Sequence, residues 1–298
     1  PPRSTLFPYT TLFRSGGDSI KAIRIVSALR AAGFTTTARD VMGAMTPRAI
    51  APLLRTAAGP RASQGVVTGV VGGTAMVEQF FAWDLAVPDH FNQDLLMEIG
   101  VGARRATIEQ VAAALSAVWY HHDALRAVVR ADRLHLRDVA EAGAFPLESV
   151  ETSADGLDGV LQQGGDRLHR GLDLVAGPLA RALLVSTPHR QCLVIVAHHL
   201  VVDLVSWQVI AEDLRTALDQ AVAGEDIPLP AKTASLREWA DALEVFTTHR
   251  ATETDTHWSA VHRALPGADL RVEMPTPETP AASARTEAFV LDAAATTA

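Results

Sequence analysis

Hydrophobic residues first recur at helical spacing just after Ser19. Asp18 and Ser19 can cap the start of this helix, and Gly33 can end it. Two shorter helices are predicted, one at 38–42 and one after Thr46, where proline takes the first helical position. The buried stripe of the first helix consists of Ala22, Ile25, Val26, Leu29 and Ala32. These patterns predict a small module that is entirely helical.

After this module the pattern changes to alternating helices and strands. Residues 59–73 are rich in glycine and small side chains, which predicts a linker with at most one short strand. Further along, the apolar run CLVIVA at 192–197 is typical of a buried strand. Strands are expected at 91–99, 127–129, 134–136, 179–186 and 192–197, and helices at 107–120, 157–170 and 206–222. Mixed elements in this order predict an α+β or α/β layer fold.

The last predicted helix begins with a capping box. Ser235 and Glu238 have the spacing at which each side chain can accept a hydrogen bond from the other's backbone N–H. An apolar stripe follows on this helix, at Trp239, Leu243 and Phe246. We expect this stripe to lie in the core.

Composition argues against several classes of function. The chain has 298 residues, 48% hydrophobic and 20% charged, as in an ordinary globular protein with a core. A net charge of −8 without a Lys/Arg cluster argues against nucleic acid or an anionic membrane as partner. The longest apolar stretch, 193–205, is interrupted by His198, His199 and Asp203, so no membrane span is expected. With one cysteine and no leader pattern, the protein is predicted to be cytoplasmic and without disulfides.

Both ends of the chain are atypical of an evolved domain. Residues 1–15 have no helical or strand periodicity, and the stretch LFPYTTLFRS within them resembles a translated sequencing adapter. We therefore expect residues 1–15 to be an artefact with no role in the fold. The chain stops inside AFVLDAAATTA, directly after a predicted strand and the first turn of a helix. This ending indicates a fragment.

The strongest candidate for chemistry is AHHLVVDLVSW, at residues 197–207. Two adjacent histidines, His198 and His199, close a buried strand, and Asp203 follows four residues later. An imidazole at the edge of the core can serve as a general base, because its ordinary pKa lies near neutral pH. On the residues alone, a hydrogen-bonded structural role is the more common one for a histidine at a strand end.

A second candidate is Ser19, in the stretch GGDSI. A serine at the start of an amphipathic helix is normally only a cap. Its oxygen would nevertheless lie at the positive end of the helix dipole, which favours an attached phosphate ester. The sequence has no GxxxxGK[ST] loop, no GxSxG turn and no HExxH or clustered cysteine spacing. We therefore expect no metal site.

The stretch GGDSIKAIRIVSALRAAGF closely resembles the second-helix motif of peptidyl carrier domains from nonribosomal peptide synthetases. TARDVM and TPRAIAPLL resemble the next two helices of such carriers. The resemblance implies that residues 16–58 are a partial carrier domain, without its first helix, and that Ser19 carries 4′-phosphopantetheine. The implied partners are a phosphopantetheinyl transferase, an upstream adenylation domain and an aminoacyl or peptidyl thioester substrate.

Downstream stretches resemble the N-terminal lobe of the condensation superfamily. They are PDHFNQDLLMEI, HHDALR and HHLVVDLVSW, and the HFNQ, HHDALR and VSW wording is typical of the epimerization subtype. Asp18 in GGDS is typical of carriers that feed epimerization domains. The resemblance implies a two-lobed α+β fold like chloramphenicol acetyltransferase. Its N-terminal lobe would be 74–250, linked to the carrier by 59–73, and 251–298 would begin a truncated second lobe.

The resemblance also implies a reaction. His199, in an HHxxxD motif with His198 and Asp203, would be one of two acid/base groups flanking the substrate Cα. These groups would convert an L-aminoacyl or peptidyl thioester to an L/D mixture. In the family the opposing group is a glutamate of the C-terminal lobe, so this chain alone is expected to be inactive.

Two alternatives to epimerization remain open. One is an ordinary condensation domain, in which His199 would assist attack of an amine on a thioester to form a peptide bond. The other is a degenerate module that only docks a carrier. If the domain is an epimerization domain, the resemblance also implies a downstream condensation domain of the same assembly line as a partner.

For several other positions the sequence predicts a particular backbone conformation or contact. Leu204 stands where the family has glycine, so strain is expected if the backbone there needs a positive φ, and the side chain could fill the channel. Arg126 keeps its family position and is expected to pair with Asp203 or with a backbone carbonyl. His121 and His122 are expected at a helix end, where they would favour the C-terminal dipole.

Overall fold

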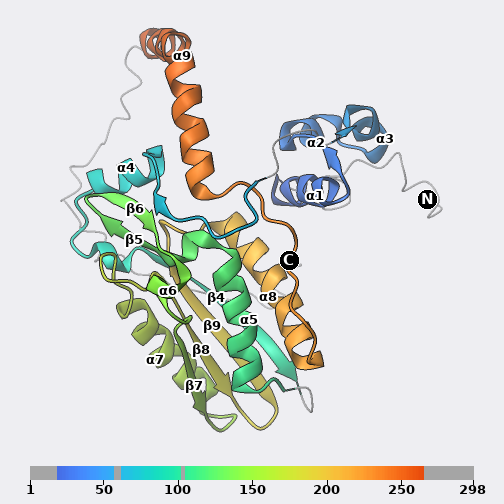
Figure 1. The fold of residues 1–298 in the computed structure, drawn as a ribbon, viewed down its shortest axis with the longest axis vertical. Helices are drawn as coiled ribbons and strands as arrows, with labels where there is room; N and C mark the ends of the chain where they lie inside the picture. The colour runs from blue at the N-terminus through green and yellow to red at the C-terminus, as the bar shows by residue number, and fades with distance from the viewer. Residues whose placement is uncertain (1–18, 57–61, 102–104, 265–298) are drawn as a thin grey trace, which may run out of the picture.

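The computed structural model describes residues 19–56, 62–101 and 105–264 (Figure 1). The segment predicted to be an adapter artefact, at 1–15, lies outside the described residues. The same holds for the GGD that precedes Ser19 and for the strand and helix turn predicted near the end of the chain.

Residues 19–56 form a small unit with three helices. Its elements are α1 (Ser19–Ala31), β1 (Phe34–Thr35), α2 (Ala38–Ala44), α3 (Pro47–Ile50), a 3₁₀ turn (Ala51–Leu53) and β2 (Arg55–Thr56). Thr37 and Asp40 form a capping box at α2, and Thr46 caps α3 by accepting a hydrogen bond from the Ala49 amide. The core consists of Ala22, Val41 and Ile50. The three predicted helices are confirmed, and the short antiparallel pair β1–β2 is an addition to them.

The larger unit alternates strands and helices. Its strands are β3 (Gly69–Val70), β4 (Asn92–Val101), β5 (Ala127–Arg130), β6 (Arg133–Leu136), β7 (Leu147–Glu151), β8 (Ala180–Ser186) and β9 (Arg190–His198). Its helices are α4 (Ala75–Ala82), α5 (Ile108–His121), α6 (Val139–Ala142), α7 (Leu157–Arg170), α8 (Leu204–Ala223) and α9 (Leu236–Ala264), with 3₁₀ turns at Pro88–His90 and Asp123–Arg126. No helix in the described ranges is long and apolar enough to cross a membrane.

Two sheets organise this unit. The larger has the strand order β4-β9-β8-β7, in which β7 runs parallel to β8 and the other neighbours are antiparallel. The smaller has the order β3-β6-β5. A mixed sheet flanked by helices confirms the α+β class that the sequence predicts.

The larger sheet is covered on both faces. Helices α5 and α8 pack together on one face, and α7 lies on the other (Figure 1). Alternate residues of β9 therefore enter two different cores. Those in the core with α5 and α8 are Leu193, Ile195 and Ala197, and those in the core with α7 are Cys192, Val194 and Val196. This double burial explains why the strand reads as a continuous apolar run.

Helix α9 corrects one expectation. Its capping box is present, because the Glu238 amide donates to Ser235 Oγ at 3.1 Å and the Ser235 amide donates to the Glu238 carboxylate at 2.7 Å. The apolar stripe, however, is not in the core. Trp239 and Phe246 are each 56% exposed, and Ala240 is the buried residue of the helix. The reason is that α9 extends away from both sheets (Figure 1).

Candidate functional site

His198 and His199 lie where β9 ends, as the sequence predicts. The pairing of β9 with β4 places His198 opposite Asn92, and the His199 amide continues it by donating to the Phe91 carbonyl at 2.8 Å. A turn then leads into α8. The histidine pair is therefore positioned by the register between the two strands.

The His198 side chain is fully buried, and both of its ring nitrogens are engaged. Nε2 lies 2.9 Å from the Pro88 carbonyl, and Nδ1 accepts a hydrogen bond from the Leu200 amide at 3.2 Å. The His198 and Phe80 rings form a T-shaped pair at a centroid distance of 5.4 Å. Burial lowers the pKa of the His198 imidazole below its usual value, although the Pro88 carbonyl acts in the opposite sense. These contacts make His198 a neutral residue that fixes the turn.

The imidazole of His199 is half-buried and stacks on Phe91 at a centroid distance of 5.0 Å. Its Nδ1 lies 2.8 Å from the Val202 carbonyl. A carbonyl only accepts hydrogen bonds, so Nδ1 carries a proton and donates it to that bond. In the neutral ring, Nε2 is therefore the nitrogen that can accept a proton.

Gln93 joins this nitrogen to Trp207. The Gln93 side-chain nitrogen lies 3.0 Å from His199 Nε2, and the Trp207 indole N–H donates to Gln93 Oε1 at 3.0 Å. An indole N–H only donates, so the amide oxygen must face Trp207 and the amide N–H must face His199. Side chains from β4, from the turn after β9 and from α8 thus form one hydrogen-bonded chain.

The sequence does not single out Gln93 or Trp207 as site residues. Each stands out only as part of a stretch, HFNQ or VSW, that is typical of the epimerization subtype. The two residues are 114 positions apart. No periodicity or spacing rule relates positions this distant, so their contact emerges only from the fold.

Asp203 caps helix α8. Its carboxylate accepts hydrogen bonds from the amide and the hydroxyl of Ser206, both at 2.7 Å. Burial, the largest influence on this group, acts to raise its pKa. The hydrogen bonds from Ser206 and Val205, together with the neighbouring His199, outweigh burial and hold the pKa of Asp203 below its usual value. The motif aspartate therefore fixes where α8 begins.

Leu204 is the first residue of α8, and the expectation of backbone strain there is wrong. The described non-glycine residues with positive φ are Met45, Asp84, Ala131 and Asp132. Leu204 instead follows the extended Asp203 directly into a right-handed helix, which requires a negative φ. Its side chain is 60% exposed.

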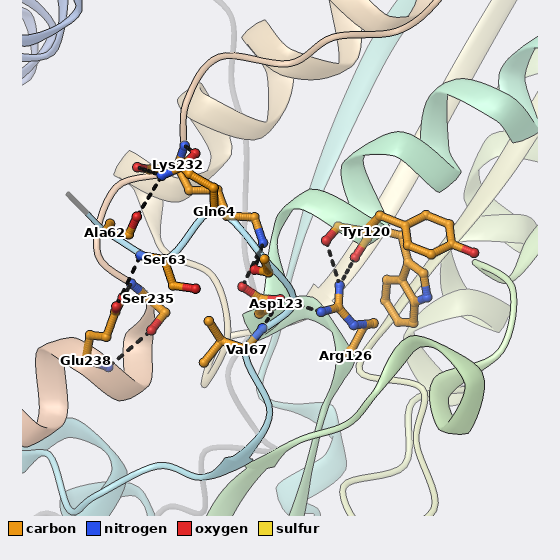
Figure 2. Close-up of polar contacts among 12 residues, drawn as sticks. Ala62, Ser63, Gln64, Val67, Tyr120, Asp123, Arg126, Lys232, Ser235 and Glu238 are labelled. Carbon is orange, nitrogen blue, oxygen red and sulfur yellow. Dashed lines mark hydrogen bonds and ion pairs between the residues drawn. The ribbon is translucent and has the colours of Figure 1, made fainter.

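Arg126 is fully buried and binds backbone carbonyls, which is one of the two arrangements expected for it. Its guanidinium donates to the carbonyls of Trp119, Tyr120 and Arg137. It also pairs with the carboxylate of Asp123, three residues earlier, in place of the alternative partner Asp203 (Figure 2). Arg126 thus stabilises the end of α5 and the turn that follows.

His121 and His122 lie at the C-terminal end of α5, as predicted, and meet Asp213 of α8. The ligand atoms of these three residues lie within 4.8 Å of one another. His122 Nε2 and Asp213 Oδ2 are already hydrogen-bonded at 2.8 Å. Burial lowers the pKa of His121, as do the charges of His122 and Lys232, against the carboxylates of Asp213 and Asp123. Because Lys232 adds positive charge, we interpret the cluster as a helix-to-helix contact.

Ser19 is the first residue of α1, as predicted, so it lies at a helix N-terminus. The first turn of α1 has no acidic residue that would offset the partial positive charge of the helix end. This end of α1 therefore suits the phosphodiester through which a 4′-phosphopantetheine arm is attached.

Two family models match the chain. The one described as "Phosphopantetheine attachment site" covers residues 5–54, and the one described as "Condensation domain" covers residues 80–298. The first match begins inside the segment 1–15. Their order along the chain is the order of carrier and lobe that the motifs predict.

Curated relatives are peptide-natural-product synthases by name, such as gramicidin and plipastatin synthases. A linear gramicidin synthase polypeptide of Brevibacillus parabrevis is 34% identical over 268 residues, which cover 86% of this chain and 5% of that protein. A plipastatin synthase polypeptide of Bacillus subtilis (strain 168) is 32% identical over 256 residues, covering 83% of this chain and 10% of that protein. The chain thus spans a tenth or less of the length of these relatives.

Solved structures share the fold. The epimerization domain from the third module of tyrocidine synthetase B is 29% identical with a TM-score of 0.59, covering 63% of this chain and 42% of that one. A teicoplanin-biosynthesis X-domain, solved in complex with OxyB, has a TM-score of 0.52 at 22% identity and covers 72% of this chain and 47% of that one. The second likeness concerns the fold alone.

Proposed function

Because the chain belongs to the condensation-domain family of nonribosomal peptide synthetases and carries a phosphopantetheine attachment site, we propose that its parent protein epimerizes a carrier-bound thioester. The substrate is an L-aminoacyl or peptidyl group, and proton transfer at Cα gives the D form. The chain spans only a small part of its relatives, so this proposal concerns the whole parent protein.

The observation that carries this proposal is the contact of Gln93 with both His199 and Trp207. Gln93 belongs to HFNQ and Trp207 to VSW, the two stretches typical of the epimerization subtype. The two side chains bind each other, and Gln93 also contacts the ring of His199. The likeness to an epimerization domain at 29% identity supports the same subtype.

The described residues give His199 what an acid/base group needs. The Val202 carbonyl holds the proton of Nδ1, and Phe91 fixes the plane of the ring. Nε2 is then the atom that takes or returns a proton, after the substrate replaces the Gln93 amide as its hydrogen-bond partner. When attached, the arm supplies a thioester, which acidifies the Cα proton of the group it carries.

Ser19 is the residue that we propose carries this arm. It begins α1 and stands in the GGDSI stretch, inside the matched attachment domain. A phosphopantetheinyl transferase would modify it, an upstream adenylation domain would supply the amino acid, and a downstream condensation domain would take the product. His198 and Asp203 support the reaction by holding the turn and the start of α8.

Peptide-bond formation is the second candidate function. It is favoured by the family match itself, which is to the condensation domain as a whole. In that reaction His199 would assist attack of an amine on the thioester, with no exchange of the Cα proton. For the degenerate docking module, the backbone-strain argument is removed, because Leu204 adopts an ordinary helical backbone. The exposed Leu204 side chain is still a candidate for filling the channel.

The experiment uses the parent synthetase, loaded with an L-aminoacyl group and placed in D₂O. We expect D product and deuterium at Cα, and a loss of about 10²–10⁴-fold in both for His199→Ala. His189→Ala is the matched control, because His189 is an exposed histidine in the turn between β8 and β9.

Two results would contradict this proposal. Peptide product without deuterium at Cα would assign condensation in place of epimerization. A His199→Ala protein that forms D product at the parent rate would leave epimerization standing but would remove His199 from its mechanism.

A further inference from the structure

Residues 62–73, which we call the strap, lie outside both family matches, since these end at residue 54 and begin again at residue 80. The strap is nevertheless built into the lobe. Its strand β3 pairs with β6, and the Val71 amide donates to the Leu134 carbonyl at 2.8 Å. Val71 is buried in the same core as α5 and α8. A segment that reads as a linker is therefore a folded part of the domain.

Lys232 binds the strap from the connection between α8 and α9. The Lys232 backbone N–H donates to Gln64 Oε1 at 2.8 Å, and Gln64 Nε2 donates to the Lys232 carbonyl at 3.1 Å. Its ammonium also donates to the Gly65 carbonyl at 2.9 Å (Figure 2). The side-chain amide of Gln64 thus satisfies both the backbone N–H and the carbonyl of Lys232.

Asp123 joins these contacts to the core. Its buried carboxylate accepts a hydrogen bond from the Val67 amide at 3.0 Å and pairs with Lys232 at 3.1 Å and with Arg126 (Figure 2). Side chains of all three charged residues are nearly or fully buried. Moving one charged residue away would leave a buried charge without its partner, which is energetically costly. These ion pairs therefore hold the strap-binding residues together.

Further contacts extend the attachment along the strap. The Ser63 amide donates to Glu238 at 3.3 Å, and Arg237 donates to the Thr68 carbonyl at 2.6 Å. A side chain at Gly69, where φ is +102°, would meet the Arg237 guanidinium at 3.0 Å. The strap therefore touches the start of α9 as well as β6 and the turn after α5.

We propose that the strap is a fixed anchor that holds the carrier domain close to its own lobe. The connection between carrier and lobe is then confined to the six steps between Thr56 and Ala62. At about 3.3–3.6 Å per residue, they span at most about 22 Å. A linker that was free from Thr56 to Thr74 would span at most about 65 Å.

The consequence for function rests on the proposed reaction at His199. Among tethers long enough to reach the site, a shorter one raises the effective concentration of the carrier at its own lobe, which scales roughly with the −3/2 power of tether length. A threefold difference in length corresponds to about a fivefold difference in effective concentration. The strap thus favours delivery of the substrate from the carrier of the same chain.

The anchor itself is tested by amide hydrogen exchange, read by NMR on the 298-residue chain. We expect the Val67 and Val71 amides to exchange about a hundredfold more slowly than in an unfolded peptide, in keeping with several hydrogen bonds. Gln64→Ala should speed exchange at Val67 by about tenfold and leave β9 unchanged, and Gln64 is exposed enough to be replaced safely. Gln163→Ala, at an exposed position of α7, is the matched control. Unprotected amides at Val67 and Val71 in the unaltered chain would overturn the anchor.

The consequence is tested in the parent synthetase with Gln64→Ala combined with Lys232→Met. Because β3 stays paired with β6, the freed tether would have 13 steps, from Thr56 to Gly69, in place of six. Turnover of its own carrier should therefore fall by up to about threefold, while turnover of a carrier supplied as a separate protein should not change. An equal loss for both carriers, or no loss for either, would overturn the delivery role. A parent protein with no activity on either carrier would refute the proposed reaction, and hydrogen exchange would still decide whether the strap is an anchor.

Discussion

The Trp207 indole N–H donates to the side-chain oxygen of Gln93 at 3.0 Å, and this contact orients the Gln93 amide N–H toward His199 Nε2. The amide cannot turn over without placing two donors opposite each other. Trp207 therefore acts on the histidine through Gln93, without touching it. Gln93 and Trp207 are positioning residues in this arrangement.

Replacing Trp207 by phenylalanine should preserve the packing and remove the donor. We expect a rate loss of about two- to tenfold in the parent enzyme, since one hydrogen bond contributes about 0.5–1.5 kcal/mol. The ¹⁵N shifts of the His199 ring should also change, because the Gln93 amide becomes free to rotate. Trp239→Phe, at an exposed tryptophan of α9, is the control. Unchanged ring shifts in Trp207→Phe would contradict the positioning role.

Two variants separate the role of Asp203 as the helix cap of α8 from the role of its negative charge. Asp203→Ala should lower the free energy of unfolding by about 1 kcal/mol, because the Ser206 amide loses its acceptor. Asp203→Asn keeps an acceptor oxygen and should restore most of that stability and activity. Urea unfolding and turnover of the parent enzyme measure the two effects. If Asn is as inactive as Ala, the carboxylate charge itself is required.

The pH dependence of stability should report on the buried histidine. The pKa of His198 is lowered in the folded protein, so between that pKa and the unfolded value of about 6.5 the unfolded chain binds more protons. Stability should therefore fall as the pH drops below about 6.5. Burial lowers the pKa values of His121 and His169 as well, and both contribute with the same sign.

His198→Gln isolates the contribution of that residue. Glutamine keeps an N–H donor for the Pro88 carbonyl but does not titrate. The loss of stability between about pH 7 and pH 5 should become smaller and should not vanish, since His121 and His169 remain. Thermal melts across this range measure it, with His189→Gln as the exposed control. An unchanged slope in His198→Gln would mean that His198 is not the buried neutral group described.

Leu204→Gly should not activate the enzyme. The residue already has a helical backbone, so glycine relieves no strain and lowers the free energy of unfolding by up to about 1 kcal/mol. Leu204→Ala should cost less, because alanine favours the helix. Deuterium exchange at Cα in the parent protein is the measurement. A clear rise in exchange for the glycine variant alone would restore a backbone constraint at this position.

Local patterns predicted the elements that position the site. The apolar run 192–197 became a strand buried on both faces, and the histidine pair closes it. Caps were equally readable, because a cap such as Thr46 or Ser235 involves residues within one turn. Each of these features depends on neighbours in the sequence, which is why the sequence alone could locate it.

Features that depend on distant partners could not be read from the sequence. The exposure of Trp239 depends on where α9 lies, although its spacing is that of a core stripe. The bond between Gln93 and Trp207 needs β4 and α8 to meet, and the burial of Val71 needs β3 to pair with β6. The Gly-rich composition of the strap indicates a flexible chain. It does not reveal that Asp123 and Lys232, far away in the sequence, bind this segment.

The double burial of β9 limits how the protein can vary. A slip of one residue would exchange the contents of its two cores and move His199 away from Gln93 and Val202. An insertion inside β9 that shifts this register is therefore expected to disrupt both cores and the His199 contacts. Length can change instead at the exposed turn of Pro188 and His189, between β8 and β9, where an added residue shifts neither register.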